Sequence, residues 1–281
     1  MQRIFIPPHV PAMLRVGDRI VRVESYSGAE PSAAVVNEPG GLLPYSKKHL
    51  GTLGWADLVA NVGIDADPAL FQWIGDAWFG QPVRDEVVLD AFDPVEKMAQ
   101  TIQLQKPLLH EVILPGLDRA SHDRRLLTVR ISPESVLRRP GGSVIVEPLE
   151  APRELRAHAF TIEIDGIDCS GVQAIAPITV QTRPASQTEG MLVFSDVHLA
   201  VAADKSGSFR GWFDDFVLRG NHGDDRELDG RITFYDPLLK DALATLELYH
   251  LGIYRMGQPK AGLAPVDLYC ERMELKTFAA I

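Results

Sequence analysis

Cysteine is scarce in this chain: Cys169 and Cys270 are the only two among 281 residues. Two cysteines are too few for the disulfide framework of a small secreted domain. We interpret both as apolar thiols buried in strands, where a free cysteine is usually found. Whether the two form a single bridge stays open, because the sequence does not say how far apart they lie.

Long apolar runs are also absent. Residues 1–13 hold one arginine, a short apolar run and three prolines, and no apolar segment of signal-peptide length follows. No stretch approaches the ~18 apolar residues of a membrane-spanning helix. We therefore expect no cleaved signal peptide, no membrane insertion, and assembly in the cytoplasm.

Positive charge is in short supply, with 28 Lys and Arg against 38 Asp and Glu and a net charge of −10. Because Lys and Arg supply most of the affinity for phosphate backbones, this balance argues against tight wrapping of nucleic acid. An acidic surface past which DNA or protein cargo slides remains compatible with it. The hydrophobic fraction of 46% is ordinary for a packed chain.

Catalytic signatures are missing as well. The eight histidines show no H-E-x-x-H spacing, and no G-x-S-x-G elbow, P-loop or G-x-G-x-x-G motif occurs. Ser121, His122 and Asp123 name the members of a hydrolytic triad, but chain neighbours cannot converge on one another. Residues 222–225, His-Gly-Asp-Asp, are typical of a solvated turn rather than a metal loop. We predict no catalytic, cofactor-binding or metal-binding residue, no cofactor and no enzyme activity.

What the chain does contain is two similar halves. Proline and glycine cluster between residues 133 and 157, a composition that breaks regular structure and indicates a linker or an exchanged strand. A strand after a Gly-Asp turn opens the first half at residues 15–23. Alternating apolar residues at 160–164 predict a half-buried strand at the start of the second. The apolar segments 53–62 and 192–201 follow; the second suits strands, and the first is ambiguous between helix and strand.

Each half then has one aromatic-rich helix candidate that ends in glycine, residues 67–80 and 208–220. Asp67 followed by Pro68 is a capping residue with a first-turn proline. The apolar stripes at helical spacing are Leu70, Trp73, Ile74 and Ala77 in the first helix and Phe209, Trp212, Phe213 and Phe216 in the second. Such rings are more often core than a sugar-binding platform.

Matching strands follow the helices. The recurring segments are Phe92-Asp93-Pro94 and Tyr235-Asp236-Pro237, Thr101–Leu104 and Thr245–Leu248, and the closing strands Leu127–Ile131 and Val266–Leu275. One helix per half is too few for the crossovers of a parallel sheet, so we predict a mainly β fold with a short helix on antiparallel sheets in each half.

This order resembles the tube-protein family of contractile phage tails and related bacterial injection systems. The likeness covers about residues 50–134 and 158–276 and rests on the helices with Trp73 or Trp212, the strands ending at Asp93 or Asp236, and the closing strands. In the first half, residues 114–121 also look like the family's loop before its last strand. The family has no catalytic signature to match.

The resemblance implies a small β-barrel or sandwich with one helix, here in tandem duplication. We expect an N-terminal arm at 1–14, a first tube-like domain at 15–135, a linker at 136–157 and a second tube-like domain at 158–281. Six family domains close into a ring, so three chains would form a pseudo-hexameric ring by self-association. Neighbouring tube, sheath or baseplate proteins are the implied partners, with cargo or DNA passing through the lumen without specific binding.

Three functions fit these observations. The first is a structural subunit of a phage tail or injection particle, in a ring of the inner tube or at its initiating or terminating end. The second is a baseplate or hub adaptor that matches a three-fold needle to a six-fold tube. The third is a carbohydrate-binding or hydrolytic β-sandwich. The sequence alone fixes neither the position along the tail nor the ring symmetry.

Overall fold

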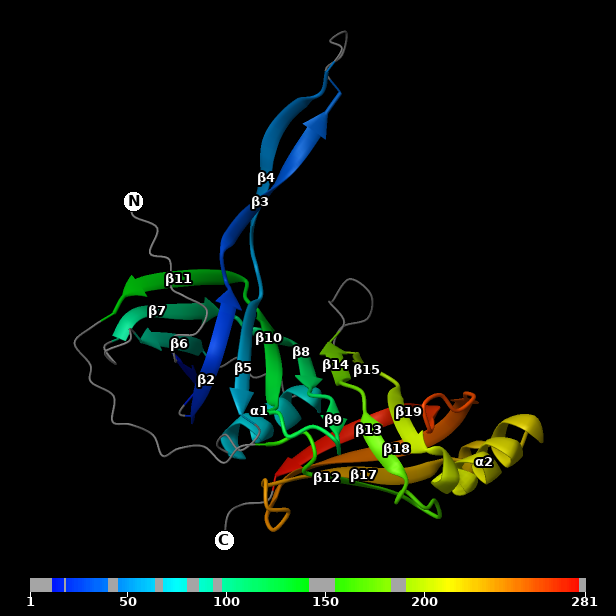
Figure 1. The fold of residues 1–281 in the computed structure, drawn as a ribbon. Coiled ribbons are helices and arrows are strands. Elements are labelled where there is room, and N and C mark those ends of the chain that lie inside the picture. Colours follow the sequence, from blue (N-terminus) through cyan, green and yellow to red (C-terminus); the bar gives the residue numbers. More distant parts are fainter. Residues whose placement is uncertain are drawn as a thin grey trace.

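The computed structural model describes residues 12–17, 19–39, 45–63, 68–79, 86–92, 98–141, 155–182 and 191–277. Within these ranges the chain is mainly β, with two large sheets, one projecting hairpin and two short helices (Figure 1). The predicted fold class is therefore confirmed. Most of the predicted N-terminal arm, and residues 142–154 of the predicted linker, lie outside the described residues; the linker range begins inside a strand.

The first sheet has ten strands in the order β11-β7-β6-β1-β2-β5-β10-β8-β14-β15. Eight come from the first half: β1 (Ala12–Val16), β2 (Arg19–Gly28), β5 (Leu58–Gly63), β6 (Val87–Phe92), β7 (Met98–Gln105), β8 (Leu108–Leu114), β10 (Leu126–Ser132) and β11 (Ser135–Pro140). The last two, β14 (Ile178–Thr182) and β15 (Leu192–Phe194), belong to the second half. All pairs are antiparallel, and apolar side chains alternate inward along strands such as β10.

The second sheet has seven strands in the order β12-β17-β18-β19-β16-β13-β9. Its members are β12 (Phe160–Ile164), β13 (Val172–Ile175), β16 (Val197–Ala202), β17 (Leu228–Tyr235), β18 (Ala242–Met256), β19 (Leu263–Thr277) and the short β9 (Leu117–Asp118). Because β9 belongs to the first half, each sheet receives strands from both halves.

Two further strands, β3 (Pro31–Glu38) and β4 (Lys47–Trp55), form a hairpin that rises away from the rest of the molecule (Figure 1). The predicted helices are present as α1 (Pro68–Trp78) and α2 (Gly207–Phe213), the latter continued by a π-helical turn, η3 (Asp214–Leu218). Short 3-10 turns, η2 (Ala203–Lys205) and η4 (Asp224–Arg226), flank them. Neither helix of the described part of the chain has the length and apolarity needed to cross a membrane.

Several strand pairs recur in both halves in the same order and register, although the β1–β2 and β7–β11 pairs of the first half have no counterpart among the described strands of the second. β1 lies beside β6 as β12 lies beside β17, and β5 lies beside β10 as β16 lies beside β19. The opposed residues at matching places are Leu14 and Leu89 against Ile162 and Ile232, and Leu58 and Ile131 against Val197 and Leu268. Residues that occupy the same place in this repeated pattern are called corresponding residues below.

Three β-bulges recur at corresponding places. One follows Val23 in β2 and Val172 in β13, where these strands lie beside β5 and β16. Another skips Ala99 in β7 and Leu243 in β18, opposite β6 and β17. The third is where β8 passes over His110 and β18 passes over Tyr254, opposite β10 and β19. Since a bulge leaves one residue out of the ladder, its position fixes the register on either side. The repeat therefore extends beyond strand order to irregularities.

The bulge residues make matching contacts. His110 Nδ1 lies 3.1 Å from Asp57 Oδ2, and the corresponding Tyr254 hydroxyl donates to Asp196 Oδ2 over 2.8 Å. Asp57 and Asp196 each come directly before a strand, β5 or β16. A carboxylate thus holds the bulge in both halves.

An ion pair beside the bulge recurs with its charges exchanged. In the first half, Arg130 Nε lies 3.0 Å from Glu111 Oε2. At the corresponding places Asp267 stands for Arg130 and Arg255 for Glu111, and these two are also paired. The Asp267 side chain is only 5% exposed, so its carboxylate depends on its cationic partner Arg255.

One long strand of the second half corresponds to two strands of the first. β18 continues through a bend at His250, with φ of 57°, whereas the first half has Lys106 at the same place, with φ of 46°, followed by Pro107. Proline has no N–H for a ladder bond, so the strand is interrupted and β7 and β8 are separate.

One hydrophobic core runs through both halves. It joins residues of α1, β5 and β10 to residues of β12, β16 and β19 in a single cluster. Phe71 and Phe160, one from each half, are among its largest fully buried side chains. Burial of such a side chain contributes about 1.5–3 kcal/mol. The halves are therefore expected to unfold together.

Candidate functional site: the junction between the halves

The candidate site is the junction between the halves, where each half adds a strand to the sheet of the other. β14 adds to the outer edge of β8, with Val180 opposite Val112 and Gln181 opposite Glu111. The Gln181 amide donates to the Glu111 carboxylate, and Thr182 Oγ donates to the Leu109 carbonyl over 3.0 Å. The first sheet thus continues without a break into the second half.

A second contact runs in the opposite direction. β9 adds to β13, with Leu117 opposite Ile175, and Arg119 N donates to the Gln173 carbonyl over 2.9 Å. The Arg119 guanidinium lies 4.8 Å from the ring centroid of Phe160, a cation–π distance. Charge and backbone bonding together anchor the first half on the second.

Helix α1 covers the junction from one side and packs against β2 and β19. Its last residue, Trp78, is 6% exposed and meets Phe194 of β15 edge to face, with ring centroids 6.3 Å apart at an interplanar angle of 89°. This geometry is the favoured one for aromatic pairs and contributes about 0.5–1.5 kcal/mol beyond burial.

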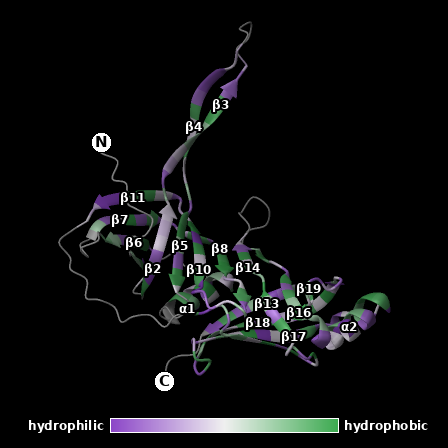
Figure 2. Cartoon of the chain, viewed as in Figure 1, coloured by the Kyte–Doolittle hydropathy of each residue, from purple (hydrophilic) through white to green (hydrophobic). Residues whose placement is uncertain are grey.

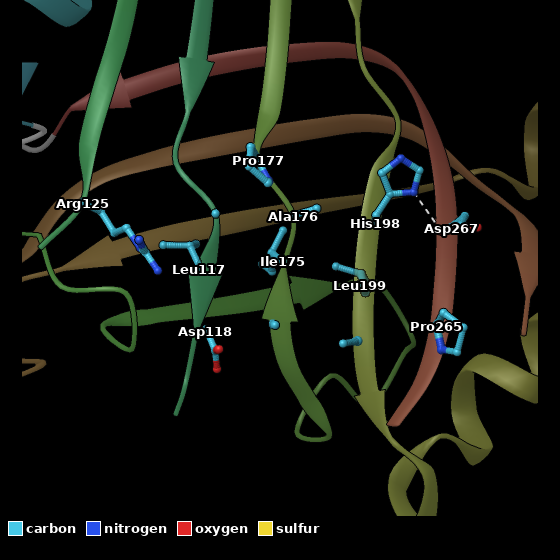
Figure 3. Close-up of a pocket in the computed structure, with 13 residues that line it drawn as sticks. Leu117, Asp118, Arg125, Ile175, Ala176, Pro177, His198, Leu199, Pro265 and Asp267 are labelled. Atoms are coloured by element: carbon cyan, nitrogen blue, oxygen red, sulfur yellow. Dashed lines mark hydrogen bonds and ion pairs between the residues drawn. The ribbon is translucent and has the colours of Figure 1, made fainter. Parts of the chain in front are cut away.

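An open groove of about 520 Å³ lies along the β9–β13 contact (Figure 3). Backbone and apolar side chains such as Ile175 and Leu199 form most of its wall. At its polar end His198 Nδ1 lies 2.8 Å from Asp267 Oδ1, while Arg255 holds the other carboxylate oxygen. The carboxylate is thus engaged on both sides, and no nucleophile of the lining set is placed beside the histidine.

The arrangement of the side chains of residues 121–123 does not suit a hydrolytic triad. Ser121 Oγ donates to Asp123 Oδ2 over 2.9 Å, while the His122 ring packs 4.4 Å from the His158 ring. The three side chains therefore do not form a relay.

A Ser-His-Asp cluster that sequence reading missed lies on three strands. Ser132 Oγ donates to Asp57 Oδ1 over 2.7 Å and also lies 3.1 Å from His110 Nδ1. Because Asp57 and Ser132 share the same ring nitrogen, the imidazole cannot pass a proton between them. The cluster holds a bulge, as its counterpart Tyr254 does.

Among the described residues, one group has metal-ligating composition: Glu227, His250 and Glu271 have ligand atoms within 4.8 Å of one another. The residues that correspond to His250 and Glu271 are Lys106 and Glu134, an ion pair of 2.7 Å. Lysine is not a metal ligand, so the first half does not repeat the metal-ligating composition. Residues 222–225 form an exposed turn, with the His222 ring packed against Phe216 at 6.1 Å.

The two cysteines are free and buried, which settles the question of a bridge. Burial raises the pKa of each thiol to about 11, with nearby carboxylates adding to the effect. Both sulfurs are therefore protonated at neutral pH and unsuited to nucleophilic chemistry.

Comparisons with known proteins give one kind of likeness. No family model matches the chain, and no curated protein matches it. The tube-terminating cap of the anti-feeding prophage is similar in structure, with a TM-score of 0.41, 13% identity, and coverage of 50% of this chain and 93% of the cap.

Two chains from an extracellular contractile injection system, PVC, are similar to the same extent. A chain of its sheath-tube complex in the extended state has a TM-score of 0.41 and 17% identity and covers 49% of this chain and 93% of its own. A chain of its sheath/tube terminator has a TM-score of 0.40 and 17% identity, with coverage of 49% and 99%.

Proposed function

We propose that this protein is a structural subunit of a phage tail or phage-tail-like contractile injection system. By self-assembly it forms a ring of the inner tube or of its initiating or terminating end. The observation that carries the proposal is the repeat: several strand pairs of the first half recur in the second with matching registers and bulges, and a continuous sheet joins the halves. Such a unit has sheet edges suited to joining further copies.

The repeat supports two tube-like domains, 15–135 and 158–281, separated by a linker at 136–157. Residues 1–14 are the arm that contacts a neighbour. Three chains supply six domains, which makes a trimer with pseudo-hexameric symmetry. One kind of domain contact, repeated around the ring, closes such an assembly.

The chemistry of the described residues favours a structural role over catalysis. The polar clusters that sequence or geometry single out hold bulges and strand pairs, as with Asp57 and Asp267. The acidic balance suits a surface past which DNA or protein cargo moves without sticking. Tube, sheath or baseplate proteins are the partners, and assembly takes place in the cytoplasm before incorporation into the particle.

The experiment is to measure the mass of the purified protein in solution and to image it by negative stain, alone and with the products of neighbouring genes. Rings of three chains around a central hole are expected. Monomers in every mixture, including the one with its gene neighbours, would refute the proposal. Removal of residues 1–10 tests the arm separately, and unchanged ring formation would remove that role.

A second candidate is the baseplate or hub adaptor, and one observation favours it. The halves are not interchangeable, because β3–β4 projects far from the first sheet while the described part of its counterpart, β14–β15, lies flat within that sheet. Unequal halves suit a place where three-fold and six-fold parts meet. Growth of the purified chain into a long, uniform tube would argue against this role.

A further inference from the structure

The β3–β4 hairpin is a two-stranded sheet, and no third described strand pairs with it. Its large exposed apolar side chains are Val35, Val36, Leu50 and Leu53, which are 56%, 40%, 73% and 61% exposed. Apolar and polar stretches both occur along its length (Figure 2). A two-stranded ribbon is only marginally stable in water by itself, because it lacks a third strand or a covering layer. The hairpin therefore has the properties of a segment that gains a partner.

The second half contains a counterpart of this hairpin, β14–β15, which does have a neighbouring strand and so indicates what kind of partner β3–β4 lacks. Pro31 is opposite Trp55 as Val180 is opposite Phe194. The backbone bonds at the base also agree: Ala56 N donates to the Glu30 carbonyl over 2.9 Å, and Ser195 N donates to the Thr179 carbonyl over 2.8 Å. The two hairpins are the same element at different lengths.

Within the chain, β14 of this element adds to the outer edge of β8. β8 corresponds to residues 252–258, of which Gly252–Met256 form the end of β18. Because β17 begins at Leu228, opposite Leu251, only β19 among the described strands pairs with β18 past that point. The residues of β8 that pair with β14, Glu111–Leu114, correspond to residues 255–258, so the free edge of β18 reaches the first two positions of the place where the first half is already joined.

The helices show the same difference between the halves: the end of the first helix is covered and that of the second is exposed. Counted from Trp73 and Trp212, which hold matching places in the two helices, Val217 stands where Trp78 stands, but it is 38% exposed whereas Trp78 is 6% exposed. Trp78 is covered by Phe194, and the residue that corresponds to Phe194 is Trp55, at the base of the lone hairpin. An exposed helix position, Val217, and the half-buried Trp55 that would cover it therefore lie in opposite halves of the chain.

We infer that a second copy of this chain joins these two surfaces: β3 of one copy adds to the free edge of β18 of its neighbour, and Val217 of the neighbour lies against Trp55. The contact repeats between chains the junction that joins the halves within a chain, and it rests on the proposed self-assembly. It is head-to-tail, since each copy gives its hairpin on one side and its edge on the other, and such a contact forms a ring when the rotation between neighbours closes. Pro31 has no N–H, so this ladder has one bond fewer than the internal one.

Cysteine cross-linking tests the register. The internal pair Gln181 and Glu111 corresponds to Ser32 and Arg255, and directly opposed Cα atoms of an antiparallel ladder lie about 4.5–5.5 Å apart, within the Cα separation that a disulfide spans. The double variant S32C/R255C is expected to form covalent dimers and larger species on mild oxidation, which reductant dissolves. The control S32C/K240C carries the same number of thiols with one in the turn before β18, away from the proposed contact, and it should stay uncross-linked.

A matched pair of charge variants tests the helix contact without touching Asp267 or its partners. V217E is expected to weaken self-association by about tenfold or more, because it buries a charge against an apolar ring. L218E is the control, since its corresponding residue, Phe79, stays 54% exposed beside the internal junction. Sedimentation velocity over a concentration series measures both, and circular dichroism checks that each variant is folded.

The outcomes separate the interface from the function. Rings that form normally in V217E, together with no specific cross-link in S32C/R255C, would overturn this interface and leave the structural role standing. A wild-type chain that stays monomeric would also overturn the contact, and detection of the chain in purified tail particles would then show that the function survives. If the hairpin instead cross-links only to a different protein, the second-copy assignment is wrong.

Discussion

Replacement of Trp78 by alanine is the most direct test of how the two halves are held together. The side chain is 6% exposed and packs on Phe194 of the other half, so its removal loses both apolar burial and an aromatic pair. Truncation of a fully buried tryptophan typically costs about 3–5 kcal/mol. Because α1 lies at the edge of the junction and can relax, we expect the free energy of unfolding to fall by about 3 kcal/mol.

The matched control is Val217→Ala, at the corresponding place in the second half. Val217 is 38% exposed in the single chain, so this change should alter the free energy of unfolding of dilute, monomeric protein by about 0.5 kcal/mol or less. Urea unfolding followed by far-UV circular dichroism measures both variants, because tryptophan fluorescence would itself change with the mutation. The comparison uses the midpoint at equal m-value. A loss below about 1 kcal/mol for Trp78→Ala, or equal losses for both, would refute the view that α1 joins the halves.

Three further outcomes follow from single sites. Burial, together with the hydrogen bond to Asp196, raises the pKa of Tyr254 to about 12. Between pH 10 and 12 the hydroxyl therefore loses its proton in the unfolded chain before it does in the folded one, and the free energy of unfolding falls as pH rises. Tyr254→Phe should flatten that fall in unfolding curves measured across this pH range. At Gly252 an added Cβ would lie 2.0 Å from Cζ of Tyr269, so Gly252→Val should lower the free energy of unfolding by about 1–3 kcal/mol, and an unchanged urea midpoint would contradict that packing. Iodoacetamide at pH 8 should label the two buried thiols slowly in native protein and fully in urea, which mass spectrometry can follow.

Local chemistry made the helices and many strands predictable. The capping pair and the aromatic stripe with Trp73 predict α1, and the helix observed at Pro68–Trp78 agrees. The Asp-Pro step correctly predicts the end of β17 at Tyr235, while its counterpart at Asp93 lies outside the described residues. The ambiguous segment 53–62 is extended throughout, as the end of β4 and most of β5 separated by two residues.

The exchange of strands between the halves could not be predicted in this way. Period-2 alternation tells which face of β14 is buried, but it does not tell which edge the strand joins. The same limit applies to the cluster of Asp57, His110 and Ser132, whose members come from separate places along the chain and meet only through strand pairing. A signal was present in hindsight: Asp57 and Asp196 each precede a strand and follow an aromatic residue by two positions.

The exchanged charges beside the bulges oppose mispairing between the two similar halves as the chain folds. If β8 paired with β19 instead of β10, Glu111 would lie opposite Asp267, and Arg130 would be left to face Arg255. Each mispairing places like charges together, and for Asp267 it does so at a buried site where repulsion is least screened. Chains with repeated domains are prone to misassembly between the copies, and like-charge contacts in the wrong pairing oppose it. One reversed pair thus lets each nascent half distinguish its own strand from the other half's.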